Sequence, residues 1–136
     1  KKPPPGHGVD VWLFKNNCNY IFDLKTVQPN VGSWIRFLDQ IHNWYWYFYS
    51  KHPTEKVIAK VIFPYNPYKG SFLDNTIGHG APMEHGAEFL SDNGFWHFIT
   101  DNSNAYSDIM NSFKQVRPIC SQIICDFVDK QLSNKV

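Results

Sequence analysis

The hydrophobic and polar positions of the first sixty residues follow two different periods. Val9 to Phe14 and Tyr20 to Thr26 are mainly β-branched and aromatic, which is typical of strands. Residues 15 to 18, KNNC, are typical of a turn, so the two runs predict a β-hairpin. Beyond Ser33, the expected N-cap, apolar residues recur at helical spacing and predict an amphipathic helix over residues 34 to 50.

The remainder of the chain predicts one more strand and several helices. Residues 56 to 63, KVIAKVIF, have the character of a buried strand, and a helix between two strands of one sheet makes those strands parallel. Residues 64 to 83 are rich in Gly, Pro and Asn and predict a long loop. Short helices are expected at 84–90 and 92–100, and one or two helices, broken near Pro118, at 106–132.

The expected fold is therefore α/β, with a small mixed sheet and additional C-terminal helices. The whole chain, residues 1–136, is expected to form one domain. Its expected parts are a tail or linker (1–7), a core (8–63), a long loop (64–83) and a helical part (84–136).

The hairpin places charged residues in an unusual pattern. If Asn16 and Asn17 form a two-residue loop, Asp10 faces Asp23 across the two strands. One face of the hairpin is then wholly apolar, while the other carries Asp10, Asp23 and Lys25. Facing side chains lie about 5 Å apart, where two carboxylates repel by roughly 3 kcal/mol at an effective dielectric of about 20. Something must offset that repulsion.

A shared divalent cation would convert the repulsion into attraction, and oxygen ligands at such a site suit Mg²⁺. Lys25, two residues after Asp23 on the same face, can then acidify an attacking water or stabilise charge on a phosphate. A three-residue turn would instead make the two aspartates diagonal neighbours. The simpler alternative is that both are solvated near strand ends and that Lys25 neutralises one of them.

Composition and charge exclude few functions for this chain. The 136 residues are 43% hydrophobic, enough for one core, and the net charge of +1 neither indicates nor excludes a nucleic-acid partner. Residues 1 to 60 carry eight Lys and Arg against four Asp and Glu, so a nucleic-acid surface is expected mainly on the first half. Three cysteines without C-x-x-C spacing predict reduced, buried thiols. Because no apolar run could span a membrane, a soluble intracellular protein is expected.

The pair formed by Asp10 and Asp23-Leu24-Lys25 resembles the PD-(D/E)xK nuclease motif, although Val9 stands where the motif has proline. The segments GVDVW, YIFDLKTVQPN and IFPYNPY more specifically resemble type II restriction endonucleases of the TdeIII kind, over roughly residues 6 to 70. In that fold a helix and an edge strand precede the Asp10 strand. Residues 1 to 7 are too few to form them, so this chain is expected to be a fragment that lacks the N-terminal core helix and strand.

The resemblance also implies roles for individual residues. Asp10 and Asp23 would be Mg²⁺ ligands, the Leu24 carbonyl a further ligand, and Lys25 the catalytic lysine, with Gln28 in support. It further implies a cytoplasmic bacterial enzyme that cleaves double-stranded DNA at a short palindromic site of the GGNCC type. A homodimer and a cognate DNA methyltransferase, as genetic partner, would accompany that activity.

Several polar residues outside the hairpin are candidates for DNA contacts. Gln28 and Asn30 follow the catalytic strand, although the polarity of a turn explains both equally well. Asn66, Tyr68 and Lys69 follow the third strand and could contact bases or phosphates, but a hydrogen-bonded structural turn is the alternative.

Two other functions compete with a restriction endonuclease. One is a nuclease of the same superfamily that acts in repair or as a resolvase. The other is a non-catalytic interaction domain whose aromatic helix docks a partner. Trp46 and Tyr49, on the far side of that helix, are expected either to pack against the later helices or to lie in a subunit interface. Stacking on bases is a third alternative, less expected of an enzyme that cuts duplex DNA.

Overall fold

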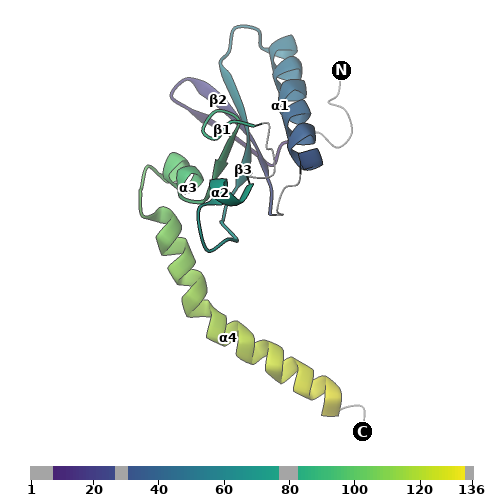
Figure 1. Ribbon diagram of the computed structural model, residues 1–136, viewed down its shortest axis with the longest axis vertical. Coiled ribbons are helices and arrows are strands. Elements are labelled where there is room, and N and C mark those ends of the chain that lie inside the picture. The colour runs from purple at the N-terminus through teal and green to yellow at the C-terminus, as the bar shows by residue number, and fades with distance from the viewer. Residues whose placement is uncertain (1–7, 27–30, 77–82, 134–136) are drawn as a thin grey trace.

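The computed structural model describes residues 8–26, 31–76 and 83–133. Its four strands form one mixed sheet in the order β1-β2-β3-β4, and helices cover both faces (Figure 1). The α/β fold predicted from the sequence is thus confirmed. The elements are β1 (Val11–Lys15), β2 (Cys18–Leu24), α1 (Val31–Lys51), β3 (Val57–Phe63), α2 (Phe72–Thr76), β4 (Phe89–Ser91), α3 (Asp92–Thr100) and α4 (Ala105–Ser133).

The hairpin of β1 and β2 has the predicted register. Lys15 lies opposite Cys18, and the antiparallel pairing continues to Val11 opposite Phe22. Asn16 and Asn17 have φ angles of 52° and 57°, the left-handed conformation that a two-residue type I′ turn requires of both loop residues. Asn tolerates this conformation better than most residues, so local turn chemistry fixes the register.

The remaining strands extend the sheet in parallel. β3 pairs in parallel with β2 after the α1 crossover, and β4 pairs in parallel with the far side of β3. The helix begins earlier than predicted, at Val31, so Ser33 lies inside α1 and its assignment as the N-cap is wrong. Trp34, which is fully buried in the first turn of α1, stabilises that turn by packing, and packing rather than the capping signal sets the start of the helix.

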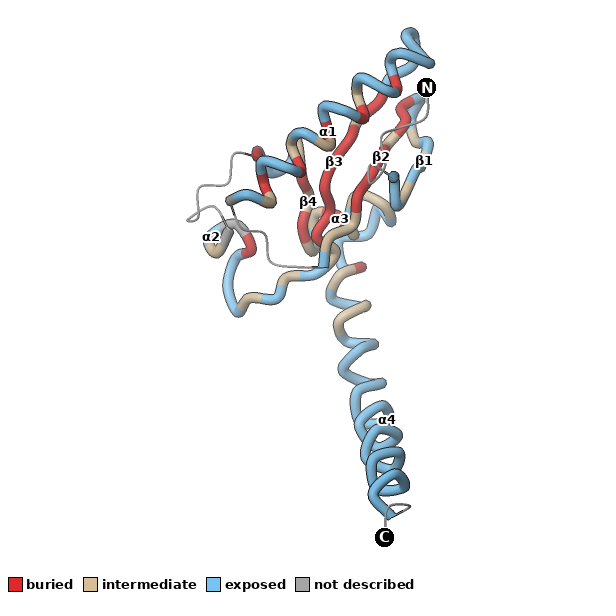
Figure 2. Tube along the Cα trace, turned by 90° about the vertical axis from the view of Figure 1, so that its right-hand side faces the viewer, coloured by how far each residue is buried: buried red, intermediate tan, exposed pale blue. Residues whose placement is uncertain are grey.

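Each face of the sheet packs against one helix, which makes three layers (Figure 2). The α1 face is the larger core. It contains Ile21, Val57, Ala59, Val61, Phe63 and Phe89 from the strands and Trp34, Phe37, Ile41, Trp44 and Phe48 from α1. The opposite face, called here the α3 face, contains Phe22 and Ile62 packed against Phe95, Trp96, Phe98 and Ile99 of α3.

The segment after β3 differs in part from the prediction. A short helix, α2, lies within the predicted long loop, and α3 confirms the helix predicted for 92–100. The helix predicted for 84–90 is wrong, because this segment forms a turn and enters β4. Phe89 is fully buried and pairs with Val61, so pairing with β3 and burial determine the conformation of this short run.

The last helix, α4, is continuous through Pro118, so the predicted break is wrong. Proline removes the hydrogen bond that would reach the carbonyl of Lys114, but both residues are exposed and water can hydrate that carbonyl. Cys18 is buried as expected, whereas Cys120 and Cys125 on α4 are exposed, contrary to the prediction. Within the described ranges, no helix has both the length and the apolar character needed to cross a membrane.

Candidate active site

Asp10 lies where the pairing of β1 with β2 ends. Its N–H donates to the Phe22 carbonyl at 3.1 Å, and its Oδ2 accepts a hydrogen bond from the Leu24 N–H at 2.8 Å. A continued antiparallel ladder would have brought the Leu24 N–H to the carbonyl of residue 9. The Asp10 carboxylate thus takes the place of a backbone acceptor and is held beside the last residue of β2.

Asp23 lies on the α1 face of the sheet, near the end of β2. Its neighbour Ile21, two residues earlier, packs in the α1 core, and strand alternation puts Asp23 on the same side. Only 4% of Asp23 is exposed. Its Oδ2 is paired with the Lys25 ammonium and has no hydrogen-bond partner from elsewhere in the described part of the chain.

Lys25 directly follows β2 and is held at both ends. Its N–H donates to the Ile62 carbonyl of β3 at 2.8 Å, which continues the parallel pairing by one residue. Its ammonium pairs with Asp23 and lies 5.4 Å from the centre of the Phe37 ring of α1, a cation–π contact. The lysine is therefore confined between a carboxylate on the sheet and an aromatic ring on the helix.

The Asp10 carboxylate, bonded to the N–H of the residue after Asp23, lies next to the Asp23 side chain. Burial raises the pKa of Asp23 above its usual value, and the neighbouring Asp10 carboxylate raises it further. The Lys25 ammonium opposes this rise. Two carboxylates and one ammonium leave a net negative charge when both acids are ionised, so the site attracts a cation.

The residues at this site fit a hard divalent cation. Both aspartates offer carboxylate oxygens from neighbouring strands, which is the ligand type that Mg²⁺ takes from proteins. In the described part of the chain, no cluster of three or more His, Cys, Asp or Glu side chains could hold a metal. A cation here would therefore be held by two carboxylates, with remaining ligands from the backbone, substrate or water.

The predicted DNA-contacting residues fall into three groups. Gln28 and Asn30 lie outside the described residues. Asn66 is engaged in a turn, because its Oδ1 accepts from the Tyr68 N–H at 2.9 Å and its Nδ2 donates to the Gly70 carbonyl at 2.8 Å. This is the structural alternative that the sequence allowed.

The other two residues of this loop differ in exposure. Tyr68 packs against the α1 core and contacts the Phe72 ring, at 5.9 Å between ring centres. Lys69 is exposed. Asn66 and Tyr68 are half-buried, so Lys69 alone of the three is exposed, and a DNA contact by this loop stays a prediction.

Sequence reasoning missed two residues that shape the site. Phe37 is one of the apolar residues at helical spacing that predict the core face of α1, yet it also contacts the Lys25 ammonium. Tyr65 donates its hydroxyl to the Thr26 carbonyl at 2.8 Å and thereby ties the loop after β3 to the residue that follows Lys25. Both contacts depend on how elements far apart in sequence cross, for which the sequence has no local signal.

Comparison with known protein families identifies the kind of protein. A family model described as "Type II restriction endonuclease, HinfI" matches residues 1–117, which is more than half of the chain. The chain belongs to the HinfI family of type II restriction endonucleases. Neither the curated proteins nor the solved structures include a match to it.

Membership of the HinfI family makes this chain a site-specific deoxyribonuclease that acts on DNA, which confirms the predicted enzyme class. The match contains all of the hairpin, α1 and β3, so the converging aspartates lie within it. The structure brings the predicted site residues Asp10, Asp23 and Lys25 together at the end of β2, with Leu24 bonded to Asp10 through its N–H.

Proposed function

We propose that this HinfI-family chain is the Mg²⁺-dependent catalytic part of a type II restriction endonuclease, with its active site at Asp10, Asp23 and Lys25. The observation that carries the proposal is the convergence of two carboxylates, one of them buried, beside an ammonium at the end of β2. Burial of an ionisable pair in this way costs free energy, which is typical of functional sites. The arrangement also supports the assignment of Asp10 and Asp23-Leu24-Lys25 as a PD-(D/E)xK motif.

Asp10 and Asp23 would hold the Mg²⁺ ion, and the Leu24 carbonyl is the proposed further ligand. The Leu24 N–H already points to Asp10, and in an extended strand the N–H and C=O of one residue point to the same side. When bound, Mg²⁺ supplies a Lewis acid that withdraws charge from a phosphate oxygen.

Lys25 has a separate role in the proposed reaction. Its ammonium would stabilise the negative charge that builds on the scissile phosphate while water attacks phosphorus in line and the bond to the leaving oxygen breaks. The contact with Phe37 limits the positions that the ammonium can occupy, which keeps it near the carboxylates. Gln28, just past this strand, would contact a phosphate or the attacking water.

The proposed substrate is double-stranded DNA with a short palindromic site. The likeness to TdeIII-type enzymes favours a target of the GGNCC type, and Asn30, Asn66, Tyr68 and Lys69 are the proposed contacts with DNA. A two-fold target favours a homodimer, since the symmetry of the protein mirrors that of its site. The proposed genetic partner is a DNA methyltransferase that protects the same sequence.

A cleavage assay with matched lysine variants tests this proposal. Duplexes that contain a randomised central region are incubated with Mg²⁺ and the wild-type protein, Lys25→Met or Lys60→Met, and the cut ends are sequenced. Lys60 is a suitable control because it lies in β3 and faces the opposite side of the sheet. We expect double-strand cuts at one palindromic sequence from the wild type and Lys60→Met, and at least about a 100-fold loss for Lys25→Met.

Different outcomes would point to different functions. Cuts at a palindrome other than GGNCC would reject the TdeIII-type target but keep the enzyme class. Nicking that depends on DNA structure rather than sequence would favour a repair enzyme or a resolvase. Equal activity of Lys25→Met and the wild type would reject Lys25 as the catalytic lysine.

A further inference from the structure

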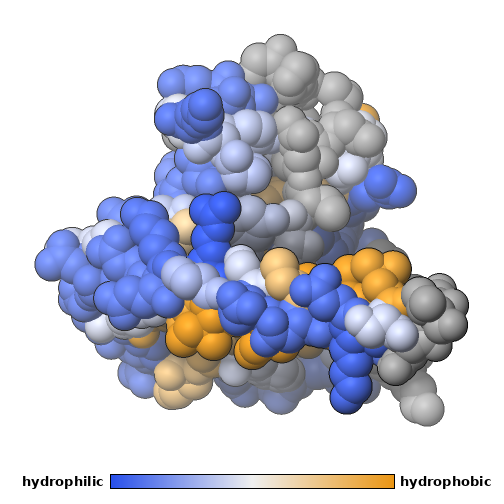
Figure 3. All heavy atoms as spheres, turned by 90° about the horizontal axis from the view of Figure 1, so that it is seen from below, coloured by the Kyte–Doolittle hydropathy of each residue, from blue (hydrophilic) through white to orange (hydrophobic). Residues whose placement is uncertain are grey.

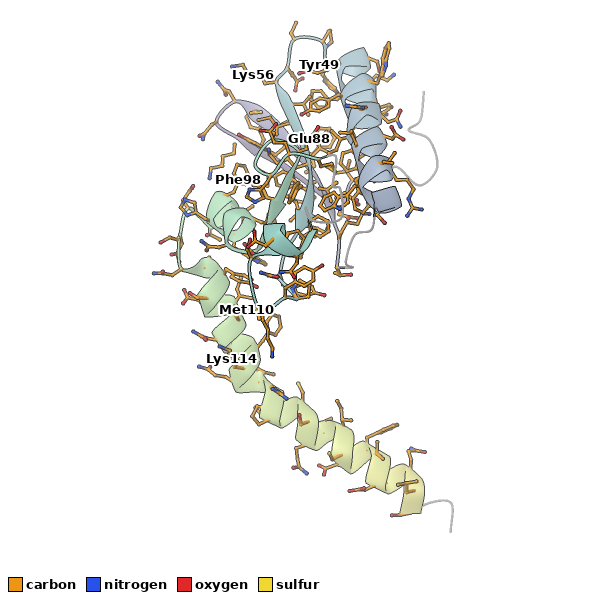
Figure 4. The ribbon with its side chains drawn as sticks, viewed as in Figure 1. Tyr49, Lys56, Glu88, Phe98, Met110 and Lys114 are labelled. Atoms are coloured by element: carbon orange, nitrogen blue, oxygen red, sulfur yellow. The ribbon has the colours of Figure 1, made fainter. Side chains whose placement is uncertain are left out.

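The helix α4 leaves the domain after its first turns. Ala105 is buried, the Tyr106 hydroxyl accepts a hydrogen bond from the Asn66 N–H at 3.0 Å, and Ile109 and Met110 are half-buried. From residue 111 to residue 133 every residue is exposed, and the helix extends away from the sheet (Figures 2 and 4). No other described part of the chain therefore covers residues 111–133 of α4.

The exposed part of α4 is amphipathic. Five apolar residues recur at alternating spacings of three and four residues, the pattern of helices that pair along their length. We call them the α4 stripe: Phe113, Val116, Cys120, Ile123 and Phe127. Ile119 and Ile124 border the stripe. The opposite face carries mainly polar residues (Gln115, Gln122 and Asp129) together with Pro118, Cys125, Val128 and Leu132.

The exposed apolar area is large enough for a stable interface. Six large apolar side chains in or beside the stripe are each exposed to between 48% and 66%: Phe113, Val116, Ile119, Ile123, Ile124 and Phe127. At on the order of 100 Å² each they offer about 600 Å², which is what one partner contributes at the lower end of the range of stable protein interfaces. In the view from below, apolar residues form several orange patches separated by hydrophilic residues (Figure 3). An exposed apolar area of about this size marks a site of association.

We propose that a second copy of this chain covers the α4 stripe, and that the two α4 helices pair in parallel as a short coiled coil. The exposed part of α4, residues 111–133, is about 34 Å long and is covered along its length only by another rod. A second α4 has the same length and the same spacing of apolar residues. In a parallel pair each stripe residue meets its own counterpart, and the seam from Phe113 to Phe127 contains no charged side chain; the next position at this spacing is Lys130.

The parallel orientation rests on the proposed function, whereas the pairing itself does not. A five-base-pair target spans only about 17 Å of duplex, at 3.4 Å per base pair. An antiparallel pair would put the two catalytic domains at opposite ends of a rod of about 43 Å. A parallel pair keeps both domains at one end, where two active sites can reach the two strands of one short target.

The first test measures the oligomeric state of the full chain. Sedimentation velocity at micromolar concentrations compares the wild type with Ile123→Glu, in the stripe, and with Gln115→Glu, which adds the same charge on the opposite face. We expect the wild type and Gln115→Glu to be dimers and Ile123→Glu to be a monomer with the same circular dichroism signal for the folded domain. A monomeric wild type, or a dimeric Ile123→Glu, would overturn the proposed interface.

The second test uses an engineered thiol near one end of the stripe to determine the orientation. Cys120 lies at the centre of the stripe and would come close to its counterpart in either orientation, so Phe127→Cys is made in a background where Cys120 and Cys125 are replaced by Ser. In a parallel pair the two copies of residue 127 are neighbours, whereas in an antiparallel pair they lie about 20 Å or more apart. A short bismaleimide should therefore cross-link this variant into a covalent dimer. Failure to cross-link in a sample shown to be dimeric would overturn the parallel orientation. Neither test depends on DNA cleavage, so their outcomes are independent of the proposed nuclease activity.

Discussion

The two faces of the sheet each place a lysine next to a buried core, but the two lysines have different surroundings. On the α1 face, Lys25 pairs with the carboxylate of Asp23, next to the carboxylate of Asp10 at the end of the strand. On the α3 face, Lys60 is only 8% exposed, and its ammonium donates to the backbone carbonyls of Gly86 and, at 2.5 Å, Ala87. The first lysine is part of a charged cluster, whereas the second ties the turn before β4 to β3.

This difference separates a functional lysine from a structural one. Burial lowers the pKa of Lys60, and Glu88 only partly opposes that effect. No carboxylate lies within ion-pair distance of Lys60 in the described part of the chain. The ammonium of Lys60 is buried and uses two of its three donors on backbone carbonyls, so its role is structural. The ammonium of Lys25, beside two acids at the end of β2, can be shared with a phosphate.

The largest expected effect comes from removing the buried carboxylate of the α1 face. Asp23→Asn keeps the volume but removes a proposed metal ligand, so we expect DNA cleavage to fall by at least about 10⁴-fold, or roughly 5 kcal/mol. The free energy of unfolding should stay the same or rise, because a charge that is costly to bury is lost. Cleavage within tenfold of the wild type would show that the two faces do not differ in function.

The next largest effect is expected from removing a side chain that is buried between α1 and the sheet. Trp44→Ala should lower the free energy of unfolding by about 3 to 5 kcal/mol, since a buried ring is lost and a cavity remains. Trp46→Ala, two residues away on the same helix and 78% exposed, should change it by less than about 0.5 kcal/mol. Urea denaturation measures both. Equal losses would mean that Trp46 is covered, for example in a subunit interface.

Lys60 should make the free energy of unfolding rise with pH in the alkaline range. A lysine in an ion pair, whose pKa is raised by folding, would have the opposite effect. Because its folded pKa lies below 10.5, the unfolded chain binds more protons between the two values, and stability rises with pH across that window. The slope is at most about 1.4 kcal/mol per pH unit. Lys60→Met should remove this rise in urea titrations at a series of pH values, and an unchanged rise would show that another group causes it.

The smallest effect is expected at the ion pair of Lys15 and Asp101, at the edge of the α3 face. The two side chains lie 2.7 Å apart, but Asp101 is well exposed, so water and salt screen the attraction. Asp101→Asn should lower the melting temperature only slightly, and the difference should vanish at high salt. A large, salt-independent decrease would mean that this pair, rather than the core, holds α3 in place.

Local signals in the sequence predicted the hairpin and its register. Alternation determines which side chains share a face, and the Asn16-Asn17 turn sets the register, which is confirmed from Lys15 opposite Cys18 to Val11 opposite Phe22. The predicted pairing of Asp10 with Asp23 does not follow, because the Asp10 N–H bonds to the Phe22 carbonyl and Asp10 reaches the end of β2 through its side chain. Local signals also predicted the crossover from β2 through α1 to β3. Each of these elements is long, and its apolar residues recur with a clear period.

Features that depend on distant contacts were not predictable in this way. β4 has only three residues, and its conformation depends on the free edge of β3. The position of Phe37 over Lys25 depends on how α1 crosses the sheet. Pro118 has helix-breaking character, but exposure lets water hydrate the freed carbonyl.

Metal binding tests the central claim most directly, since Asp10 and Asp23 are proposed to hold one cation together. Mn²⁺ binding, followed by electron paramagnetic resonance without DNA, compares the wild type with Asp10→Asn, Asp23→Asn, the double aspartate variant and Lys25→Met. We expect each aspartate variant to lose the bound ion, and Lys25→Met to bind at least as tightly as the wild type, because the competing ammonium is gone. Undiminished binding by the variant that lacks both carboxylates would contradict the account.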